Sequence, residues 1–223
     1  SSPCRSTNYK QLNTNSMNKK LPDKTVERLS QYRRALLNYL SGGKHHIFSH
    51  EIANLLHITA VQVRRDIMLI GYTGTLRQGY DAKELIDIIG KIIDTRDGQK
   101  VAVVGIGNLG RAIMGYFSGK RTKLSIVAAF DSNPEKVGKI YAGVQCYHSD
   151  EMLEIIKREG ISVAVISVPG EVATQVAETL VMAGIRGILN FSPKALNVPP
   201  HVYLQEYDMI TMLEKIAYFV KKS

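Results

Sequence analysis

The stretch Lys100–Arg111 reads KVAVVGIGNLGR, and it decides the fold of the chain around it. A β-branched apolar run leads into Gly105, Gly107 and Gly110, spaced as G-x-G-x-x-G, and a helical pattern follows. In a strand–turn–helix unit the first glycine allows a tight turn, the second lets a pyrophosphate approach the backbone, and the third lets helix and strand pack closely. The free N–H groups at the helix start then face the phosphates. The stretch therefore predicts a dinucleotide-binding fold.

Asp131 supports this interpretation, because it lies about twenty residues beyond the last glycine, at the end of a second apolar run, where a carboxylate binds ribose hydroxyls. Helical patterns then alternate with apolar runs such as Ile161–Val168. This alternation predicts an α/β domain with a Rossmann-type, doubly wound parallel sheet. Ligands of such sheets lie beyond the carboxyl ends of the strands, which places Val168, Pro169 and the loop Asn190–Pro193 near the dinucleotide. Ordinary strand-to-loop junctions are the alternative for these residues.

Length and composition predict two domains and no membrane span. The chain has 223 residues, and no apolar run approaches the length of a membrane helix. Its start lacks a basic segment followed by an apolar one, so we expect no signal peptide. Cys4 and Cys146 are far apart, which favours reduced thiols in a cytoplasmic protein. His45, His46 and His50 lie close together without a cysteine or carboxylate cluster, so we expect no metal site.

The net charge of +9 is concentrated in the N-terminal part of the chain. Residues 1–66 hold 11 Lys/Arg against 4 Asp/Glu, whereas residues 101–223 hold 13 against 11. Such asymmetry indicates a polyanionic partner for the N-terminal part alone.

Two short helices in this basic part resemble a helix-turn-helix. Ser49 is expected to cap the first, and Thr59 the second, where Gln62 completes a capping box. Gln62, Arg64 and Arg65 come early in the second helix, where side chains of a recognition helix reach base edges. A plain helical hairpin is the alternative. The glycine-rich segment 71–80 then predicts a β-wing with Arg77 at its tip.

Composition also gives the domain boundaries. Residues 1–20 are polar and aperiodic, which predicts a disordered tail. We expect a winged-helix DNA-binding domain at 21–94, a dinucleotide-binding domain at 95–205 and a C-terminal helix within 206–223. This last helix has a strong apolar face. Packing on its own sheet and packing on a second subunit are both open for that face.

Several motifs together resemble the Rex family of redox-sensing transcriptional repressors, from about Leu21 to the C-terminus. They are TAVQVRRD, VGIGNLGRAI, FDSNPEKVG, VAVISVP, AGIRGILNFSP and YDMITMLEKI. The resemblance implies a homodimer whose C-terminal helices are swapped between subunits. NAD⁺ would permit binding to palindromic double-stranded operator DNA, and NADH would release it. The regulated genes would be those of fermentation and respiration.

The resemblance also implies roles for residues of the dinucleotide domain. The glycine motif would hold the pyrophosphate, Asp131 the adenosine ribose, and the ends of two later strands the nicotinamide. The residues implied to contact NADH or NAD⁺ are Gly105, Gly107, Asn108, Leu109, Gly110, Asp131, Val168, Pro169, Asn190, Phe191, Ser192 and Pro193.

Further roles fall on the DNA-binding domain and on the contacts between domains. Three positions that couple the domains in the family match Arg34, Tyr116 and Asp208, with unrelated surface residues as the alternative. The chain departs from the family at Leu76-Arg77, where the wing arginine is displaced by one position. The candidate DNA-contacting residues are Ser49, Thr59, Gln62, Arg64, Arg65 and Arg77.

Two other functions compete with the repressor. An NAD-dependent dehydrogenase needs a proton donor or acceptor beside the hydride site and a substrate domain. Past the glycine motif the only histidines are His148 and His201, and no segment of substrate-domain size remains. A nucleotide-binding module for a coenzyme A-like ligand is the other alternative, against which Asp131 favours a free ribose diol. We therefore expect a sensor and not an enzyme.

Overall fold

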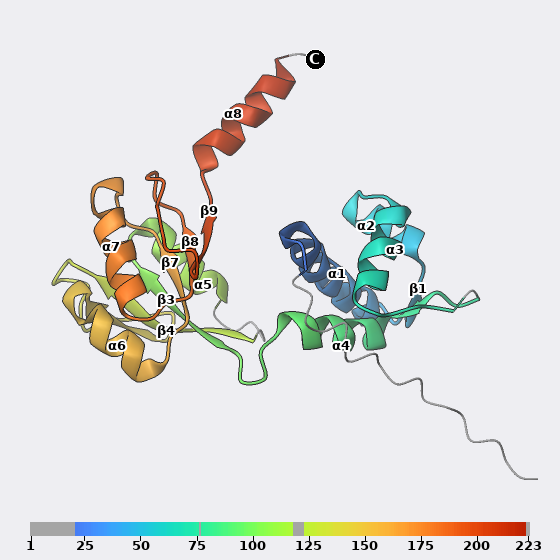
Figure 1. Cartoon of the computed structure of the whole chain (residues 1–223), viewed down its shortest axis with the longest axis horizontal. Helices are drawn as coiled ribbons and strands as arrows, with labels where there is room; N and C mark the ends of the chain where they lie inside the picture. The colour runs from blue at the N-terminus through green and yellow to red at the C-terminus, as the bar shows by residue number, and fades with distance from the viewer. Residues whose placement is uncertain (1–20, 76, 118–122, 222–223) are drawn as a thin grey trace, which may run out of the picture. The chain divides into compact units, whose positions relative to one another are not determined.

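The computed structural model describes residues 21–75, 77–117 and 123–221. The chain divides into two compact units, Ser1–Thr95 and Arg96–Ser223 (Figure 1). The tail expected to be disordered, residues 1–20, and Leu76 of the wing lie outside the described residues.

The N-terminal unit is mainly helical. Its core forms because apolar residues recur at helical spacing: Leu29, Tyr32 and Leu36 share one face and are fully buried. Ile52 and other residues of the following helices pack on them. The elements are α1 (Asp23–Ser41), β1 (His46–Ile47), α2 (Ser49–Leu56), α3 (Ala60–Leu69), β2 (Tyr80–Asp81) and α4 (Ala82–Ile93).

The expected winged helix-turn-helix is present in this unit. His57 ends α2 in the left-handed conformation, with φ of 53°, and turns the chain into α3. β1 and β2 pair antiparallel. Between them, Thr75 and Gly79 exchange two backbone hydrogen bonds and close a short loop that carries Arg77.

Two expected helix caps differ in detail. Ser49 is the first residue of α2 and not its cap, because the N-cap is Phe48, whose N–H donates to Glu51 Oε2 at 2.8 Å. Thr59 does cap α3, accepting from the Gln62 N–H at 3.2 Å. The Gln62 side chain, however, donates to Asp66 and so does not complete a capping box.

The C-terminal unit contains a seven-stranded sheet in the order β5-β6-β4-β3-β7-β8-β9. All neighbouring strands are parallel except the pair β5–β6. Such strands are buried on both faces and therefore read as continuous apolar runs. They are β3 (Gln99–Val104), β4 (Leu124–Asp131), β5 (Ile140–Tyr141), β6 (Val144–His148), β7 (Val163–Ile166), β8 (Gly187–Asn190) and β9 (Tyr203–Glu206).

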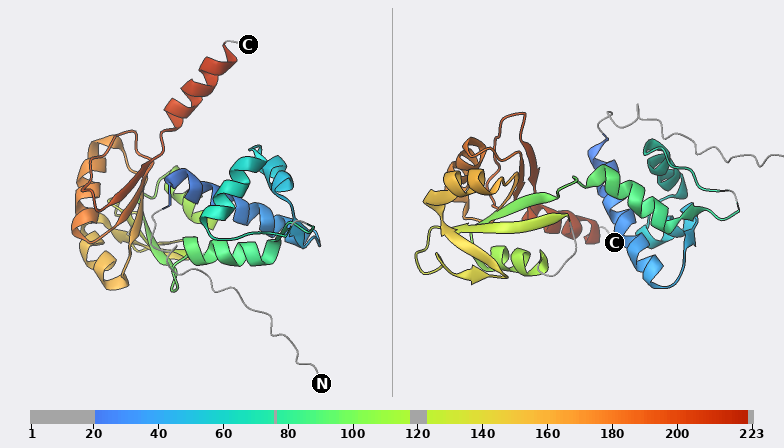
Figure 2. Two further views of the ribbon diagram at one scale, coloured as in Figure 1. Left: turned by 45° about the vertical axis from the view of Figure 1, so that its right-hand side comes forward. Right: turned by 90° about the horizontal axis from the view of Figure 1, so that it is seen from below.

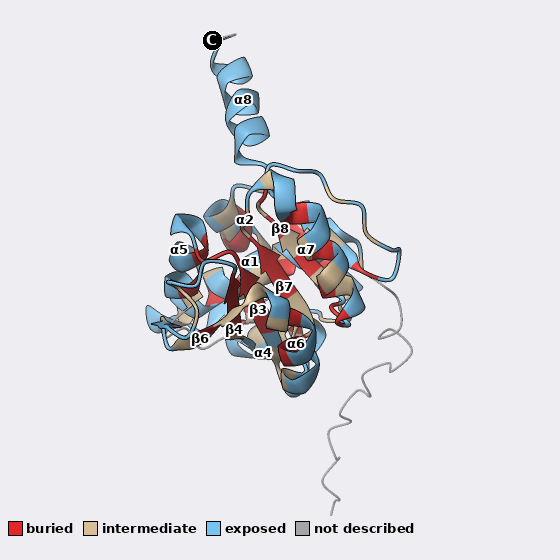
Figure 3. Ribbon diagram, turned by 90° about the vertical axis from the view of Figure 1, so that its left-hand side faces the viewer, coloured by how far each residue is buried: buried red, intermediate tan, exposed pale blue. Residues whose placement is uncertain are grey.

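Helices cover both faces of this sheet, as the doubly wound fold requires (Figures 1 and 2). α6 (Met152–Glu159) and α7 (Gly170–Met182) lie on one face, and α5 (Asn108–Phe117) lies on the other. The central strands between them are the most buried part of the unit (Figure 3). The strand order reverses at β3: the chain runs from β3 to β4, β5 and β6 on one side of it and then crosses to β7, β8 and β9 on the other.

The hairpin β5–β6 is a feature that the sequence did not predict. Residues 138–143 (GKIYAG) begin and end with glycine, which is typical of a loop, and Val144–His148 (VQCYH) mixes polar with apolar residues. In the structure β6 pairs parallel with β4, from Ala129 with Cys146 to Asp131 with His148. Residues that follow β6 therefore lie at the same sheet edge as the end of β4.

The C-terminal helix α8 (Met209–Val220) buries no residue in the single chain (Figure 3). Ile210, Leu213 and Phe219 are all more than half exposed. Of the two packing partners left open by the sequence, its own sheet is therefore excluded for this conformation. An apolar face left exposed in this way marks an interaction site.

Candidate functional site

The three glycines of the motif differ in what a side chain would meet. A Cβ at Gly105, where φ is +92°, would lie 2.6 Å from the Ser167 carbonyl oxygen. A Cβ at Gly110 would collide with the Gly105 carbonyl oxygen, so α5 and β3 need its absence to pack. At Gly107 a Cβ would meet nothing within 4 Å, which leaves its backbone open to a ligand. This geometry is compatible with the three predicted roles, and the contact of Gly107 with a pyrophosphate stays a prediction.

Asp131 lies at the end of β4 beside this motif. Its Oδ2 accepts from the Ile106 N–H at 2.7 Å and from Lys136 Nζ at 2.9 Å. Its Oδ1 accepts from the Asn133 N–H at 2.9 Å. The carboxylate thus ties the glycine loop to the turn after β4. A carboxylate offers about four acceptor positions, so the described residues leave one position on Oδ1 for a ligand hydroxyl.

The ionisation of Asp131 suits this role. Burial raises the pKa of a carboxyl group, but the hydrogen bonds from Lys136, Asn133 and Ile106 outweigh it and hold the pKa of Asp131 below its usual value. Asp131 is therefore ionised at neutral pH, and both oxygens act as acceptors.

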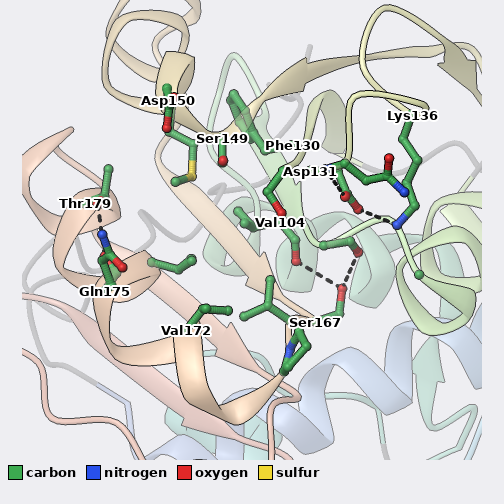
Figure 4. Close-up of a pocket in the computed structure, with 18 residues that line it drawn as sticks. Val104, Phe130, Asp131, Lys136, Ser149, Asp150, Ser167, Val172, Gln175 and Thr179 are labelled. Carbon is green, nitrogen blue, oxygen red and sulfur yellow. Dashed lines mark hydrogen bonds and ion pairs between the residues drawn. The ribbon is translucent and has the colours of Figure 1, made fainter.

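A cavity of 660 Å³ opens at the carboxyl ends of β3, β4 and β7 (Figure 4). This volume is in the usual range for small-molecule sites. Figure 4 shows Asp131 and Lys136 at one side and Gln175 and Thr179 of α7 at the other. Five of the predicted cofactor residues line the cavity, namely Gly105, Gly107, Asp131, Val168 and Pro169.

The other predicted cofactor residues lie outside the cavity lining. Asn108, Leu109 and Gly110 begin α5. Asn190 is buried and braces its own loop, since its Oδ1 accepts from the Ser192 N–H at 2.9 Å and its Nδ2 donates to the Lys194 carbonyl at 2.8 Å. Phe191 packs on Tyr207, with ring centroids 5.2 Å apart, and Pro193 lies beside Gly170 at the start of α7.

Several lining residues were missed from the sequence. The Ser167 hydroxyl donates to the Gly105 carbonyl at 2.9 Å and so fastens the glycine loop to β7. The spacing of the α7 residues was a readable signal, because positions i, i+3, i+4 and i+7 share one helix face. The missed lining residues include Lys136, Ser149, Asp150, Met152, Ser167, Val172, Gln175, Val176 and Thr179.

The three arginines predicted to contact DNA lie on the outside of α3 and in the wing. Arg64 and Arg65 are exposed, and Arg64 Nη1 donates to Ser49 Oγ at 3.0 Å. Arg77 is exposed at the middle of the loop closed by Thr75 and Gly79. Gln62 is half-buried. α3 thus offers two exposed cationic side chains near its start, as a recognition helix does.

One acidic residue of α3, Asp66, is completely buried. It accepts hydrogen bonds from Arg28 and Tyr32 of α1 and from Gln62 of its own helix. No local sequence pattern distinguishes it from an exposed helical aspartate. Burial raises its pKa, but these hydrogen bonds outweigh the burial and leave the pKa of Asp66 below its usual value.

The three expected coupling residues are distributed over both units. Arg34 is exposed on α1 of the N-terminal unit. Tyr116 is exposed near the end of α5, its ring edge-on to Phe117. Asp208 caps α8, with Oδ1 accepting from the Ile210 N–H at 2.9 Å and Oδ2 accepting from the Thr211 hydroxyl at 2.6 Å. The hydrogen bonds from Thr211 lower the pKa of Asp208.

Two further properties concern the described part of the chain. None of its helices combines the length and apolar character needed to cross a bilayer. Within the same residues, no group of three or more His, Cys, Asp or Glu side chains is placed to hold a metal ion.

A basic helix-turn-helix unit joined to a nucleotide-type sheet defines a class, namely transcription regulators controlled by a nucleotide. The family described as putative DNA-binding protein N-terminus matches residues 20–67, and the CoA binding domain family matches residues 96–194. The redox-sensing transcriptional repressor Rex of Anoxybacillus flavithermus is 38% identical over 91% of this chain and 95% of its own length. That of Geobacillus sp. is 38% identical over 90% and 93%. The chain therefore belongs to the Rex family of redox-sensing transcriptional repressors.

Solved structures agree with this assignment. The Rex-family repressor RSP in complex with β-NAD⁺ and operator DNA has a TM-score of 0.84 and 29% identity, covering 92% of this chain and 94% of that one. RSP in complex with β-NADH has a TM-score of 0.80 and 28% identity over 92% and 96%. The family consists of transcriptional repressors, so the dehydrogenase alternative is set aside.

Proposed function

We propose that this chain is a cytoplasmic redox sensor that represses transcription as a homodimer, bound to a palindromic operator with NAD⁺ and released when NADH replaces it. The observation that supports this proposal most strongly is that Asp131 and the open backbone of Gly107 line the same cavity. RSP, which shares the fold over nearly the whole chain, is known in complex with both forms of the dinucleotide.

The cavity fits a dinucleotide in three respects. Gly107 leaves room at the backbone for a pyrophosphate, and Asp131 keeps an acceptor position for a ribose hydroxyl. Val168 and Pro169 supply apolar surface at the end of β7 for the nicotinamide. We assign the dinucleotide-binding domain to residues 95–205, with Asn108, Leu109, Gly110 and the loop Asn190–Pro193 completing the site.

DNA binding is assigned to residues 21–94. Arg64 and Arg65 would enter the major groove with Gln62, and Arg77 would reach the minor groove. Ser49 and Thr59 stand at the starts of α2 and α3, where short polar groups contact phosphates.

The dimer is assigned to the C-terminal helix, residues 206–223. α8 exposes Ile210, Leu213 and Phe219 in the single chain, and an equivalent chain offers the apolar surface that would cover them. A helix swapped between subunits would carry Asp208 with it and bring it into a coupling role with Arg34 and Tyr116.

A DNA-binding titration over a series of NADH/NAD⁺ ratios tests the proposal. At fixed salt and fixed total dinucleotide, a rising NADH fraction should lower the affinity for a palindromic operator, because NADH must bind the non-repressing state more tightly. Affinity that does not depend on the ratio would overturn the redox function. Steady oxidation of NADH with candidate substrates would instead favour an enzyme.

A further inference from the structure

The carboxylate of Asp66 has every acceptor position filled from within its own unit. Oδ2 accepts from Arg28 Nε at 2.6 Å and from the Tyr32 hydroxyl at 2.6 Å. Oδ1 accepts from Arg28 Nη2 at 2.8 Å and from Gln62 Nε2 at 3.0 Å. These are four donors for about four acceptor positions.

The network holds α3 against α1 through a two-pronged contact. Arg28 binds both oxygens of Asp66, and its Nη2 also lies 3.3 Å from the Thr25 hydroxyl. Bidentate arginine–carboxylate pairs fix orientation as well as distance. Replacing a buried ion pair by apolar residues is often neutral or stabilising. A contribution to stability therefore does not by itself explain why the Arg28–Asp66 ion pair is present in this core.

Gln62 is the member of this network that leads from the buried carboxylate to the surface. It is half-buried and lies one helical turn before Asp66, on the same face of α3. A carboxylate only accepts hydrogen bonds, so the Gln62 amide must turn its nitrogen toward Asp66. Among the described residues, neither its Oε1 nor the second N–H of Nε2 takes part in a hydrogen bond, so one acceptor and one donor of the amide stay available.

We infer that Asp66 is a positioning residue for base recognition, because it orients the Gln62 amide so that one acceptor and one donor are presented at the start of α3. Adenine offers the complementary pair in the major groove, N7 as acceptor and N6 as donor. Rotating the amide would leave Asp66 Oδ1 with an unfilled position in a fully buried site. The inference rests on the proposed DNA-binding role of α3.

The test compares operators that differ at one base pair. Affinities of the full-length protein are measured at fixed salt for duplexes in which each A·T pair of a half-site is replaced in turn. Gln62→Ala should lose roughly tenfold discrimination at one position. Asp66→Asn should lose discrimination at that same position, while preferences at the other positions change less than about twofold.

Glu84→Gln is the matched control. It makes the same carboxylate-to-amide change in another tyrosine–carboxylate pair of this unit, since Glu84 Oε2 accepts from the Tyr72 hydroxyl at 2.8 Å. It should leave discrimination at every position intact. A loss of affinity in Asp66→Asn that is uniform over all positions would reduce Asp66 to a structural residue and overturn the inference.

A second measurement decides the matter if Asp66→Asn does not fold. In the wild-type protein without DNA, the NMR order parameter of the Gln62 side-chain amide should approach that of rigid backbone, about 0.85. A value below about 0.6 would contradict the inference. Failure of the wild-type chain to bind any duplex of the panel would contradict the proposed function, and the order parameter would still decide how the amide is held.

Discussion

Asp66 and Asp131 are two buried carboxylates, one in each unit, that resemble each other closely. Their exposed fractions are 0% and 9%, each has a cationic partner within 3 Å, and each has a lowered pKa. They differ in the number of hydrogen-bond acceptor positions that remain unfilled. Asp66 receives four hydrogen bonds from its own unit, whereas Asp131 receives three and faces a cavity. The unfilled acceptor, and not burial or charge, distinguishes a ligand site from an internal brace.

The largest expected effect comes from removing the cationic partner of Asp66, and removing that of Asp131 gives the comparison. Arg28→Ala leaves Asp66 charged and buried, which should destabilise the N-terminal unit by about 3–5 kcal/mol. Lys136→Ala should cost the C-terminal unit only about 1 kcal/mol, because water in the cavity can solvate Asp131. Hydrogen exchange resolved by unit in increasing denaturant measures both. Equal losses would contradict the distinction between brace and site.

The two carboxylates also differ in how far the sequence could predict them. Asp131 follows a glycine motif at a known spacing and ends an apolar run, so its place at the cavity was predicted from local pattern. Asp66 is paired with Arg28, 38 residues away, through the packing of two helices. No local pattern states which helix faces meet, so this pair could only be seen in the folded structure.

The same limit applies to the cavity itself. The ends of β3, β4 and β7 were expected to meet because parallel strands share an edge. Ser149 and Asp150 line the cavity because they follow β6. The mixture of polar and apolar residues in β6 did not predict a strand. Its parallel pairing with β4 is a tertiary contact that overrides weak local preference.

A second prediction concerns the free acceptor of Asp131. Asp131→Ala should weaken NADH binding by about 100-fold, or about 2.7 kcal/mol, because it removes a charged acceptor for the ribose and loosens the glycine loop. Titration calorimetry measures the loss. Glu135→Ala, which removes an exposed carboxylate from the same turn, is the control and should change affinity less than about twofold. A similar loss in Arg28→Ala that still folds would break the assignment of separate roles to the two carboxylates.

A smaller effect is expected on the exposed surface that Asp66 supports. Arg65→Ala should weaken operator binding about tenfold and leave NADH affinity unchanged, because Arg65 belongs to the other unit from the cavity. A phosphate contact would lower the salt slope by about one, whereas a base contact would cost affinity at one operator position. Arg186→Ala makes the same charge change on the surface of the C-terminal unit. If it weakened operator binding as much, net charge and not the recognition helix would carry the effect.

The smallest expected effect is on acid stability, where the two carboxylates should behave alike. Each has a folded-state pKa below the unfolded value, so its stabilisation is complete above about pH 4 and is lost as the pH falls through the folded pKa. The stability difference between wild type and Asp131→Asn should therefore be constant from pH 8 to 5 and shrink below pH 4, and Asp66→Asn should do the same in the N-terminal unit. Unit-resolved denaturation across this range measures both. Saturating NADH should change the acid dependence of stability in the C-terminal unit only. A ligand that needs the ionised Asp131 links dinucleotide binding to the titration of Asp131 and not to that of Asp66. A shift of the N-terminal transition by NADH in the same range would show that the two carboxylates are coupled.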